Sequence, residues 1–319
     1  MSSDGFTSGP APPQVVWLDD PRCMDPRLVG PKAAHLSRLS RHYPVPSGFC
    51  VTAAAFRTCA VSLTVDEKLR AVIADAYARL AQSGAAVAVR SSAVDEDGRD
   101  ASFAGQLASH LNVHGVDAVI VALEATWRSS HSQSVRAYRR DHDLAGSQEV
   151  AVLVQRLVYA DASGVAFSLD PVSGDAQRIV VNATWGLGES LVNGTIEPDR
   201  YVFTKSTLAL VTAEVGTKER MTIASGSAGY STGTTQVTTP TFLRSRPALS
   251  PQQQTTAATL TRDLEAQLGW PVDVEFAFGP EGLSLLQCRP VTASTQPSAN
   301  LAPVDMIRAG ARDAAEDAI

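Results

Sequence analysis

The strongest constraint on the fold is a strand–turn–strand pattern near the C-terminus, VDVEFAFGPEGLSLLQCRP at residues 272–290. Its first half alternates apolar residues with others, as in a strand that turns one face to a core. The alternating apolar residues are Val272, Val274, Phe276 and Phe278. The opposite face then carries two carboxylates, Asp273 and Glu275. A chain with this pattern is expected to build an antiparallel sheet with one polar face.

The turn between these two strands decides which side chains meet. If Pro280, Glu281 and Gly282 form a three-residue turn, with Gly282 in the left-handed conformation, Glu275 pairs with Gln287 and Asp273 with Arg289. A four-residue turn would put Glu275 and Gln287 on opposite faces.

Two readings of this polar face remain open. Carboxylate and amide oxygens suit Mg²⁺ bound to substrate phosphates, and an arginine can contact a phosphate directly. A solvated polar face with an ordinary Asp273–Arg289 ion pair would give the same pattern.

Two cations near the N-terminal half are further candidates. Lys32, in VGPKAAHL, opens a predicted helix and would suit an anion there, although a lone lysine is commonly a solvated surface residue. Arg90 ends an apolar strand, so its guanidinium needs a carboxylate or a phosphate as partner. The carboxylates within reach by spacing are Asp95, Glu96 and Asp97.

The glycine-containing segments exclude two common nucleotide motifs. Gly105, in ASFAGQ, could lie over phosphates, but such a turn is weak evidence by itself. No segment matches the Walker A pattern, and WGLGES at 185–190 lacks the further glycine of a dinucleotide fingerprint. We interpret WGLGES as a strand-to-helix turn.

Length and composition indicate a soluble chain of about two lobes. It has 319 residues, 44% of them hydrophobic and 19% charged, and no apolar run approaches the roughly 18 residues that a membrane helix needs. The net charge of −6 argues against nucleic acid as a partner. Four cysteines without C-x-x-C spacing, and an N-terminus without a secretory pattern, predict a cytoplasmic protein with free, buried thiols.

Along the chain, the composition predicts two lobes between two tails. The predicted units are a disordered segment 1–14, an N-terminal lobe 15–145, a C-terminal lobe 146–293 and a tail or linker 294–319.

Within these units, the helices have recognisable ends. Helices are expected at 64–84, with a Thr64–Glu67 capping box, and from Ser250 to Leu268. The strand at 149–158 is expected to open the second sheet, and 216–246 to be irregular.

Seven motifs, in this order, resemble the N-terminal ATP-binding domain of the phosphoenolpyruvate synthase, pyruvate phosphate dikinase and rifampicin phosphotransferase family. They are GPKAAHL, VPSGFCVTAAAF, AVRSSAVDEDGRDASFAGQ, VAVLVQRLV, SGVAFSLDPVSG, NATWGLGESLVNGTIEPDRYV and VDVEFAFGPEGLSLLQCRPVT. The resemblance covers about residues 15–292. It implies an α+β fold of ATP-grasp type, with the nucleotide held between two lobes.

The resemblance also implies roles for individual residues. Phosphates would be neutralised by Lys32, Arg90 and Arg289 and covered by the loop of Gly105 and Ser109, while Gln155 would lie on the adenine side. Magnesium would be held by Glu275 and Gln287. Asp273 would be a further carboxylate, which either contacts these ligands without binding the metal or binds a second metal ion. In this sequence Pro31 replaces a frequent glycine, which removes one backbone donor beside the phosphates.

By the same resemblance, the chain would bind ATP and Mg²⁺ and act as a phosphotransferase component. It would donate a pyrophosphoryl group to a histidine, which then keeps the β-phosphate, on a swivelling domain that is separate or missing. None of its six histidines lies in the small, glycine-rich loop that such a histidine occupies. The small-molecule acceptor stays open between pyruvate, an antibiotic hydroxyl and another metabolite. Two alternatives are an ATP-binding regulatory module without phosphotransfer and a self-contained small-molecule kinase.

Overall fold

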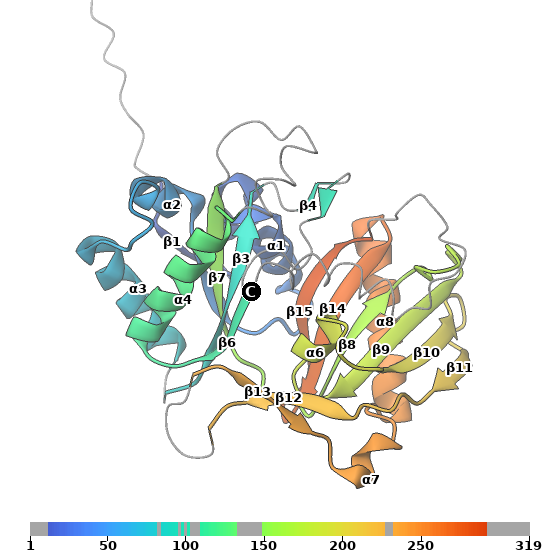
Figure 1. The fold of residues 1–319 in the computed structure, drawn as a ribbon. Coiled ribbons are helices and arrows are strands. Elements are labelled where there is room, and N and C mark those ends of the chain that lie inside the picture. The colour runs from blue at the N-terminus through green and yellow to red at the C-terminus, as the bar shows by residue number, and fades with distance from the viewer. Residues whose placement is uncertain are drawn as a thin grey trace, which may run out of the picture.

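The computed structural model describes the chain in seven stretches, which are residues 12–81, 84–94, 97–98, 101–102, 109–132, 149–226 and 232–291. Within them the chain forms two antiparallel sheets that stand side by side, with helices packed against both (Figure 1). The predicted α+β class is therefore what the structure shows.

The first sheet has five strands in the order β1-β2-β7-β3-β6, and each neighbouring pair is antiparallel. Its strands are β1 (Val15–Trp17), β2 (Gly48–Val51), β3 (Val87–Ala93), β6 (Ser109–Val113) and β7 (Val150–Arg156). The central strand β7 pairs with β2 on one side and β3 on the other.

This pairing corrects the expectation that the strand at 149–158 opens the second sheet. Residues Val150 to Gln155 of β7 are buried without alternation, as expected for a strand in the middle of a sheet with both faces covered. Position along the chain does not determine which strands pair. The change from one sheet to the other therefore falls between β7 and the next strand, and not near residue 145.

The second sheet has six strands in the order β11-β10-β9-β8-β14-β15, also antiparallel throughout. Its strands are β8 (Ala162–Phe167), β9 (Arg178–Trp185), β10 (Asp199–Thr204), β11 (Leu210–Glu214), β14 (Val272–Gly279) and β15 (Gly282–Pro290).

Two further strand pairs lie outside these sheets. They are β4 (Asp97–Gly98) with β5 (Ala101–Ser102), and β12 (Arg220–Ala224) with β13 (Thr234–Thr238). The second pair corrects the expectation that 216–246 is irregular. Its strands are largely exposed and rich in threonine, so they lack the apolar alternation by which a strand is recognised.

The helices cover the outer faces of the sheets and fill the space between them. They are α1 (Pro26–Leu39), α2 (Ala53–Cys59), α3 (Glu67–Leu80), α4 (Val116–Ser129), α6 (Glu189–Val192), α7 (Thr241–Arg244) and α8 (Pro251–Leu268), with a short 3-10 helix η1 (Pro21–Met24). No helix in the described stretches is both long and apolar enough to cross a bilayer.

The predicted helix ends were right for one helix and partly wrong for another. Ser250 caps α8, and its side chain and that of Gln253 form a reciprocal capping box. In α3 the cap is Asp66, whose carboxylate accepts from the Leu69 amide, and not the predicted Thr64. A carboxylate beside a helix N-terminus gains from the helix dipole as well as from the hydrogen bond.

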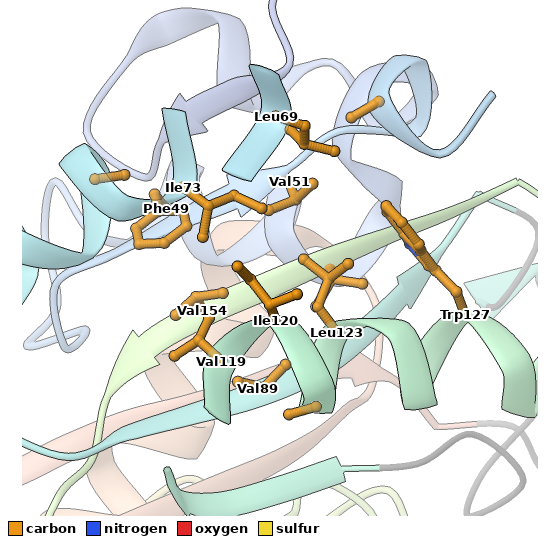
Figure 2. Close-up of a cluster of buried hydrophobic side chains, with 14 of the residues drawn as sticks. Phe49, Val51, Leu69, Ile73, Val89, Val119, Ile120, Leu123, Trp127 and Val154 are labelled. Atoms are coloured by element: carbon orange, nitrogen blue, oxygen red, sulfur yellow. The ribbon is translucent and has the colours of Figure 1, made fainter. Parts of the chain in front are cut away.

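One apolar core lies between the first sheet and helices α3 and α4. Figure 2 shows Leu123 and Trp127 of α4 directed toward the sheet strands, with Phe49 and Ile73 in the same cluster. Trp127 is fully buried, and its indole N–H donates to the Val150 carbonyl at 3.1 Å. This core holds the outer layer of the first lobe on its sheet.

A second core is shared by both sheets. It combines apolar side chains of α1 and β7 with those of α8, β14 and β15, so that Leu36, Leu153, Leu264 and Leu285 belong to one cluster. Because α1 packs against strands of both sheets, the two lobes are joined by a common apolar layer.

All four cysteines are buried free thiols, as the sequence predicted. Burial raises the pKa of Cys23 to about 12 and also raises the pKa of Cys50 and Cys288. These thiols are therefore protonated at neutral pH and behave as small apolar side chains.

Candidate functional site

A cavity of about 330 Å³ opens between the two sheets, and it is lined by seven of the nine residues that the sequence singled out. These seven are Lys32, Arg90, Ser109, Gln155, Glu275, Gln287 and Arg289. Gly105 lies outside the described residues, and Asp273 is not among the residues that line the cavity. Side chains from positions far apart in the sequence thus meet at one place, whose size suits a small ligand.

Lys32 reaches the cavity from α1. The helix is broken at Gly30, whose φ of 74° and ψ of 160° are not helical, and a regular helix resumes at Pro31. Lys32 therefore lies in the first turn after the break, as the sequence predicted. Proline is well tolerated there because the first residues of a helix have no intrahelical partner for their N–H groups.

Arg90 reaches the cavity from β3 and contacts the other lobe. Its guanidinium donates to the Leu286 carbonyl at 3.2 Å and lies 3.5 Å from the Glu275 carboxylate. Both charged side chains are about one fifth exposed, so the contact is partly screened by solvent. The side chains of the expected alternative partners Asp95, Glu96 and Asp97 lie outside the described part.

Ser109 and Gln155 line the first-sheet wall of the cavity. Ser109 on β6 is directly opposite Arg90 in the strand register. Gln155 on β7 is 2% exposed, and its amide nitrogen donates to the Pro46 carbonyl at 2.8 Å. This bond fixes the side-chain amide and leaves its oxygen as an acceptor.

The hairpin of β14 and β15 has the predicted register, but for a different reason. Glu275 pairs with Gln287, as expected. The turn, however, has two residues, since Gly279 pairs with Gly282, and a bulge at Leu286 restores the register. Gly282 has the expected positive φ, 91°.

The bulge has a chemical consequence. It inserts Leu286 as an extra residue beside Glu275, and the carbonyl of this residue accepts the hydrogen bond from Arg90. The bulged strand therefore carries both Gln287 and an acceptor for the guanidinium into the cavity.

Asp273 forms an ion pair with Arg289. The Arg289 guanidinium donates twice to one carboxylate oxygen of Asp273, at 2.9 and 2.7 Å. The carboxylate is mostly buried, and the arginine lies on the cavity wall. This geometry matches the ion pair that the sequence left as an alternative, and it does not support direct metal binding by Asp273.

The charges around the cavity are unbalanced. Among the described residues, four cations line it, Lys32, Arg90, Arg156 and Arg289, against the two carboxylates of Glu189 and Glu275. The lining is thus positive in a chain whose net charge is −6. A concave, partly dry surface concentrates such a field, so the cavity favours an anionic ligand.

Sequence reasoning missed the part of the cavity wall that lies outside the β14–β15 hairpin on the second-lobe side. Leu157 and Val158 follow β7 and lead into the second lobe, and Glu189 and Asn193 come from the region of α6. The segment WGLGES contained the relevant signal, since a strand-to-helix turn at the end of β9 delivers α6 to the cavity. The Glu189 carboxylate accepts a hydrogen bond from Thr234 at 2.6 Å.

The polar groups at the hairpin fit a magnesium ion that is shared with a phosphate ligand. Glu275 and Gln287 bring one carboxylate and one amide to the same side of paired strands. In the described residues, no cluster of three or more His, Cys, Asp or Glu side chains could enclose a metal by itself. Magnesium typically takes few protein ligands and completes its shell with waters and phosphates.

Comparison with known proteins identifies the family to which the chain belongs. The model of the pyruvate phosphate dikinase AMP/ATP-binding domain matches residues 59–307, and the chain belongs to this family. This membership confirms the resemblance drawn from the motifs, and the two antiparallel sheets with their helices confirm the predicted α+β class.

Three curated relatives are about one third identical to this chain over the aligned part. The prodigiosin synthesizing transferase PigC of Serratia marcescens is 32% identical over an alignment of 308 residues, and the match covers 90% of this chain and 34% of the relative. The rifampicin phosphotransferase of Streptomyces sviceus is 33% identical, covering 83% of this chain and 34% of the relative. A probable phosphoenolpyruvate synthase of Methanocaldococcus jannaschii is 30% identical, covering 90% and 27%. The chain spans about a third of the length of these relatives.

A solved structure of D-alanine–D-alanine ligase from Helicobacter pylori also aligns with 87% of this chain and 61% of its own. The identity is 12% and the TM-score 0.33, values too low to bear on the site or the activity.

Proposed function

We propose that this chain binds MgATP in the cavity between its sheets and supplies a phosphoryl group to a histidine carried on a separate swivelling domain. The observation that supports this most is the convergence of Lys32, Arg90, Arg289, Glu275 and Gln287 on one cavity in a chain of the AMP/ATP-binding family.

The proposed work of the residues is charge neutralisation and positioning. Lys32, Arg90 and Arg289 would contact the polyphosphate and offset the charge that grows on it during in-line attack. Asp273 would hold the Arg289 fork in one orientation through its double contact. Arg90 would exchange its long contact with Glu275 for a phosphate oxygen.

Magnesium, when bound, would supply Lewis-acid stabilisation of the charge on the phosphates. Glu275 and Gln287 are the residues that would hold it. The Glu275 carboxylate is released for this role when Arg90 turns to the phosphates.

The histidines of the chain favour a histidine supplied from elsewhere. Of its six histidines, five lie in the described residues, and none of these five lines the cavity. His110 follows the cavity residue Ser109 on β6, where successive side chains point to opposite faces of the sheet. Burial lowers the pKa of His110, which keeps it neutral. A histidine fixed in the wall could not travel to a second active site.

The form of the transfer that we propose comes from the family resemblance of the motifs. In the form we propose, a histidine nitrogen attacks the β-phosphorus of ATP, the bond between the β-phosphorus and the oxygen that joins it to the α-phosphate breaks, and AMP leaves. Water or inorganic phosphate then removes the γ-phosphate, and the β-phosphate stays on the histidine. Pyruvate, an antibiotic hydroxyl and another metabolite stay equally open as final acceptors.

Calorimetric titration with ATP, with and without Mg²⁺, tests the binding step. We expect Glu275→Ala to weaken magnesium-dependent ATP binding by roughly tenfold, because a charged ligand of the metal is lost. Glu281→Ala is the matched control, since Glu281 lies exposed in the turn of the same hairpin and should leave affinity unchanged. Equal affinities for both variants and the unchanged chain would refute the assignment of Glu275.

Incubation with MgATP labelled at the β-phosphate tests the transfer step. The chain alone should bind nucleotide and acquire no acid-labile, base-stable label. Label should appear on a polypeptide that carries the family's swivelling histidine domain once that polypeptide is added. Stoichiometric labelling of this chain by itself would instead establish a self-contained phosphotransferase.

A further inference from the structure

The short turn that carries Lys32 rests on one buried side chain of β3. The backbone amide of Ala33, next to Lys32, donates to the Ser92 hydroxyl oxygen at 3.2 Å. Ser92 is fully buried. The hydroxyl thus anchors the first turn of the helix by one of the N–H groups that a helix start leaves without an intrahelical partner.

Backbone packing holds the same turn against Ser92. A Cβ atom on Gly30 would lie 2.1 Å from the Ser92 carbonyl oxygen and 2.4 Å from its hydroxyl oxygen. Only glycine, which has no side chain, lets the backbone come this close to Ser92. The positive φ of Gly30 is also a conformation that glycine adopts more readily than other residues. The break in α1 and the position of Ser92 therefore depend on each other.

Ser92 also fixes the relation between the two cations of the first lobe. It lies two residues after Arg90 on β3, so both side chains are on the same face of the strand. Arg90 points into the cavity, and Ser92 receives the helix start that brings Lys32 there. One strand thus places one cation directly and the other through a hydrogen bond.

From this geometry we propose that Ser92 is a positioning residue, which sets Lys32 relative to Arg90 so that both can contact one polyphosphate. The proposal rests on the function proposed above. Ser92 is fully buried and is not among the residues that line the cavity, so its effect on ligand binding would pass through Lys32.

A double-mutant cycle on the full chain tests this. MgATP affinity is measured by calorimetry for the unchanged chain, Ser92→Ala, Lys32→Met and the double variant. Removing the hydroxyl should weaken binding by roughly three- to tenfold, as expected for one hydrogen bond, and Lys32→Met by roughly tenfold or more. The double variant should bind no more weakly than Lys32→Met alone, because Ser92 then has nothing left to position.

Ser91→Ala is the matched control. Ser91 is also buried on β3, but it points to the opposite face of the sheet, and its loss should leave affinity unchanged. If Ser92→Ala does not fold, Ser92→Cys enters the same cycle, since it keeps the size of the side chain with a weaker acceptor. Thermal unfolding confirms the fold of each variant.

The possible outcomes separate the two proposals. Normal affinity of the Ser92 variant, or losses that multiply in the double variant, would overturn the positioning role while leaving the nucleotide site in place. Absence of MgATP binding by the unchanged chain, or an unaffected Lys32→Met variant, would overturn the proposed function itself. Both proposals would be supported if the double variant bound MgATP no more weakly than Lys32→Met alone while Ser91→Ala bound it normally.

Discussion

Arg90 contacts the other lobe and also belongs to the proposed ligand site. Its guanidinium comes from the first sheet and contacts the Leu286 carbonyl and the Glu275 carboxylate of the second. The ion pair is long and partly exposed, so it contributes little to stability. The same group is one of four cations around the cavity. The geometry therefore favours a role in ligand binding over a role in holding the lobes together.

We expect Arg90→Lys to reduce ATP affinity more than stability. Lysine keeps the charge but cannot reach two acceptors with a planar fork, so affinity should fall by roughly tenfold, with a melting temperature lowered by only about a few degrees. Titration calorimetry and thermal unfolding measure the two effects. A large loss of stability with normal affinity would show that the ion pair is structural.

Arg200→Lys is a matched control for this change. Arg200 pairs with Asp170 at 3.4 Å with similar exposure, and it is not among the residues that line the cavity. The same substitution there should leave ATP affinity unaltered.

The hairpin of β14 and β15 shows what sequence patterns can predict and where they stop. Alternation placed Asp273 and Glu275 on one strand face and paired them with the right partners. The predicted turn was wrong, because the hairpin has a two-residue turn and a bulge at Leu286 where a three-residue turn was expected. A bulge depends on what the strand packs against, and local sequence does not reveal it. Glu189 and Leu157 escaped prediction for the same reason, because tertiary packing alone brings these connecting segments to the cavity.

The pair of β12 and β13 connects the two lobes at one end of the cavity. In Figure 1 this hairpin runs below both sheets. The Asn112 side chain on β6 donates to the carbonyls of Ser225 and Gly233 at 3.1 and 2.8 Å. At its other side Thr222 accepts from the Leu187 amide at 2.8 Å. Thr234 and Gln236 of β13 add side-chain hydrogen bonds to Glu189 and Thr195, so polar contacts on both sides hold the hairpin in place.

Asn112→Ala should therefore loosen the hairpin. The change removes the two side-chain hydrogen bonds to the hairpin and the contact of the Asn112 oxygen with His114. It also puts alanine at a φ of 55°, where asparagine is better tolerated. We expect faster hydrogen exchange in β12 and β13, and a loss of about 1–3 kcal/mol in the free energy of unfolding. Unchanged exchange would show that other contacts hold the hairpin.

Ser225→Ala serves as the control for this prediction. It removes only the hydroxyl contact with Thr235 inside the hairpin and keeps the carbonyl that Asn112 uses. Exchange at the junction with β6 should then stay as in the unchanged chain.

The core shared by the two sheets determines how the molecule as a whole unfolds. The sequence predicted two lobes divided near residue 145, whereas β7 belongs to the first sheet and its Leu153 lies in one cluster with Leu264 and Leu285 of the second. The pattern of composition along a chain can predict that there are two lobes, but it cannot predict that an apolar layer joins them. Because α1 and α8 both contribute to this layer, neither sheet keeps its full core without the other.

We therefore expect one cooperative thermal transition for both lobes, and a substitution in the shared core should shift all of it. Leu264→Ala, at a fully buried position of α8, should lower the free energy of unfolding by about 2–5 kcal/mol, because it removes buried apolar atoms and leaves a cavity. Leu210→Ala is the matched control on the exposed edge strand β11 and should cost at most about 0.5 kcal/mol. Calorimetry with two separate transitions, of which Leu264→Ala moves only one, would show that the lobes unfold independently and that the shared layer does not couple them.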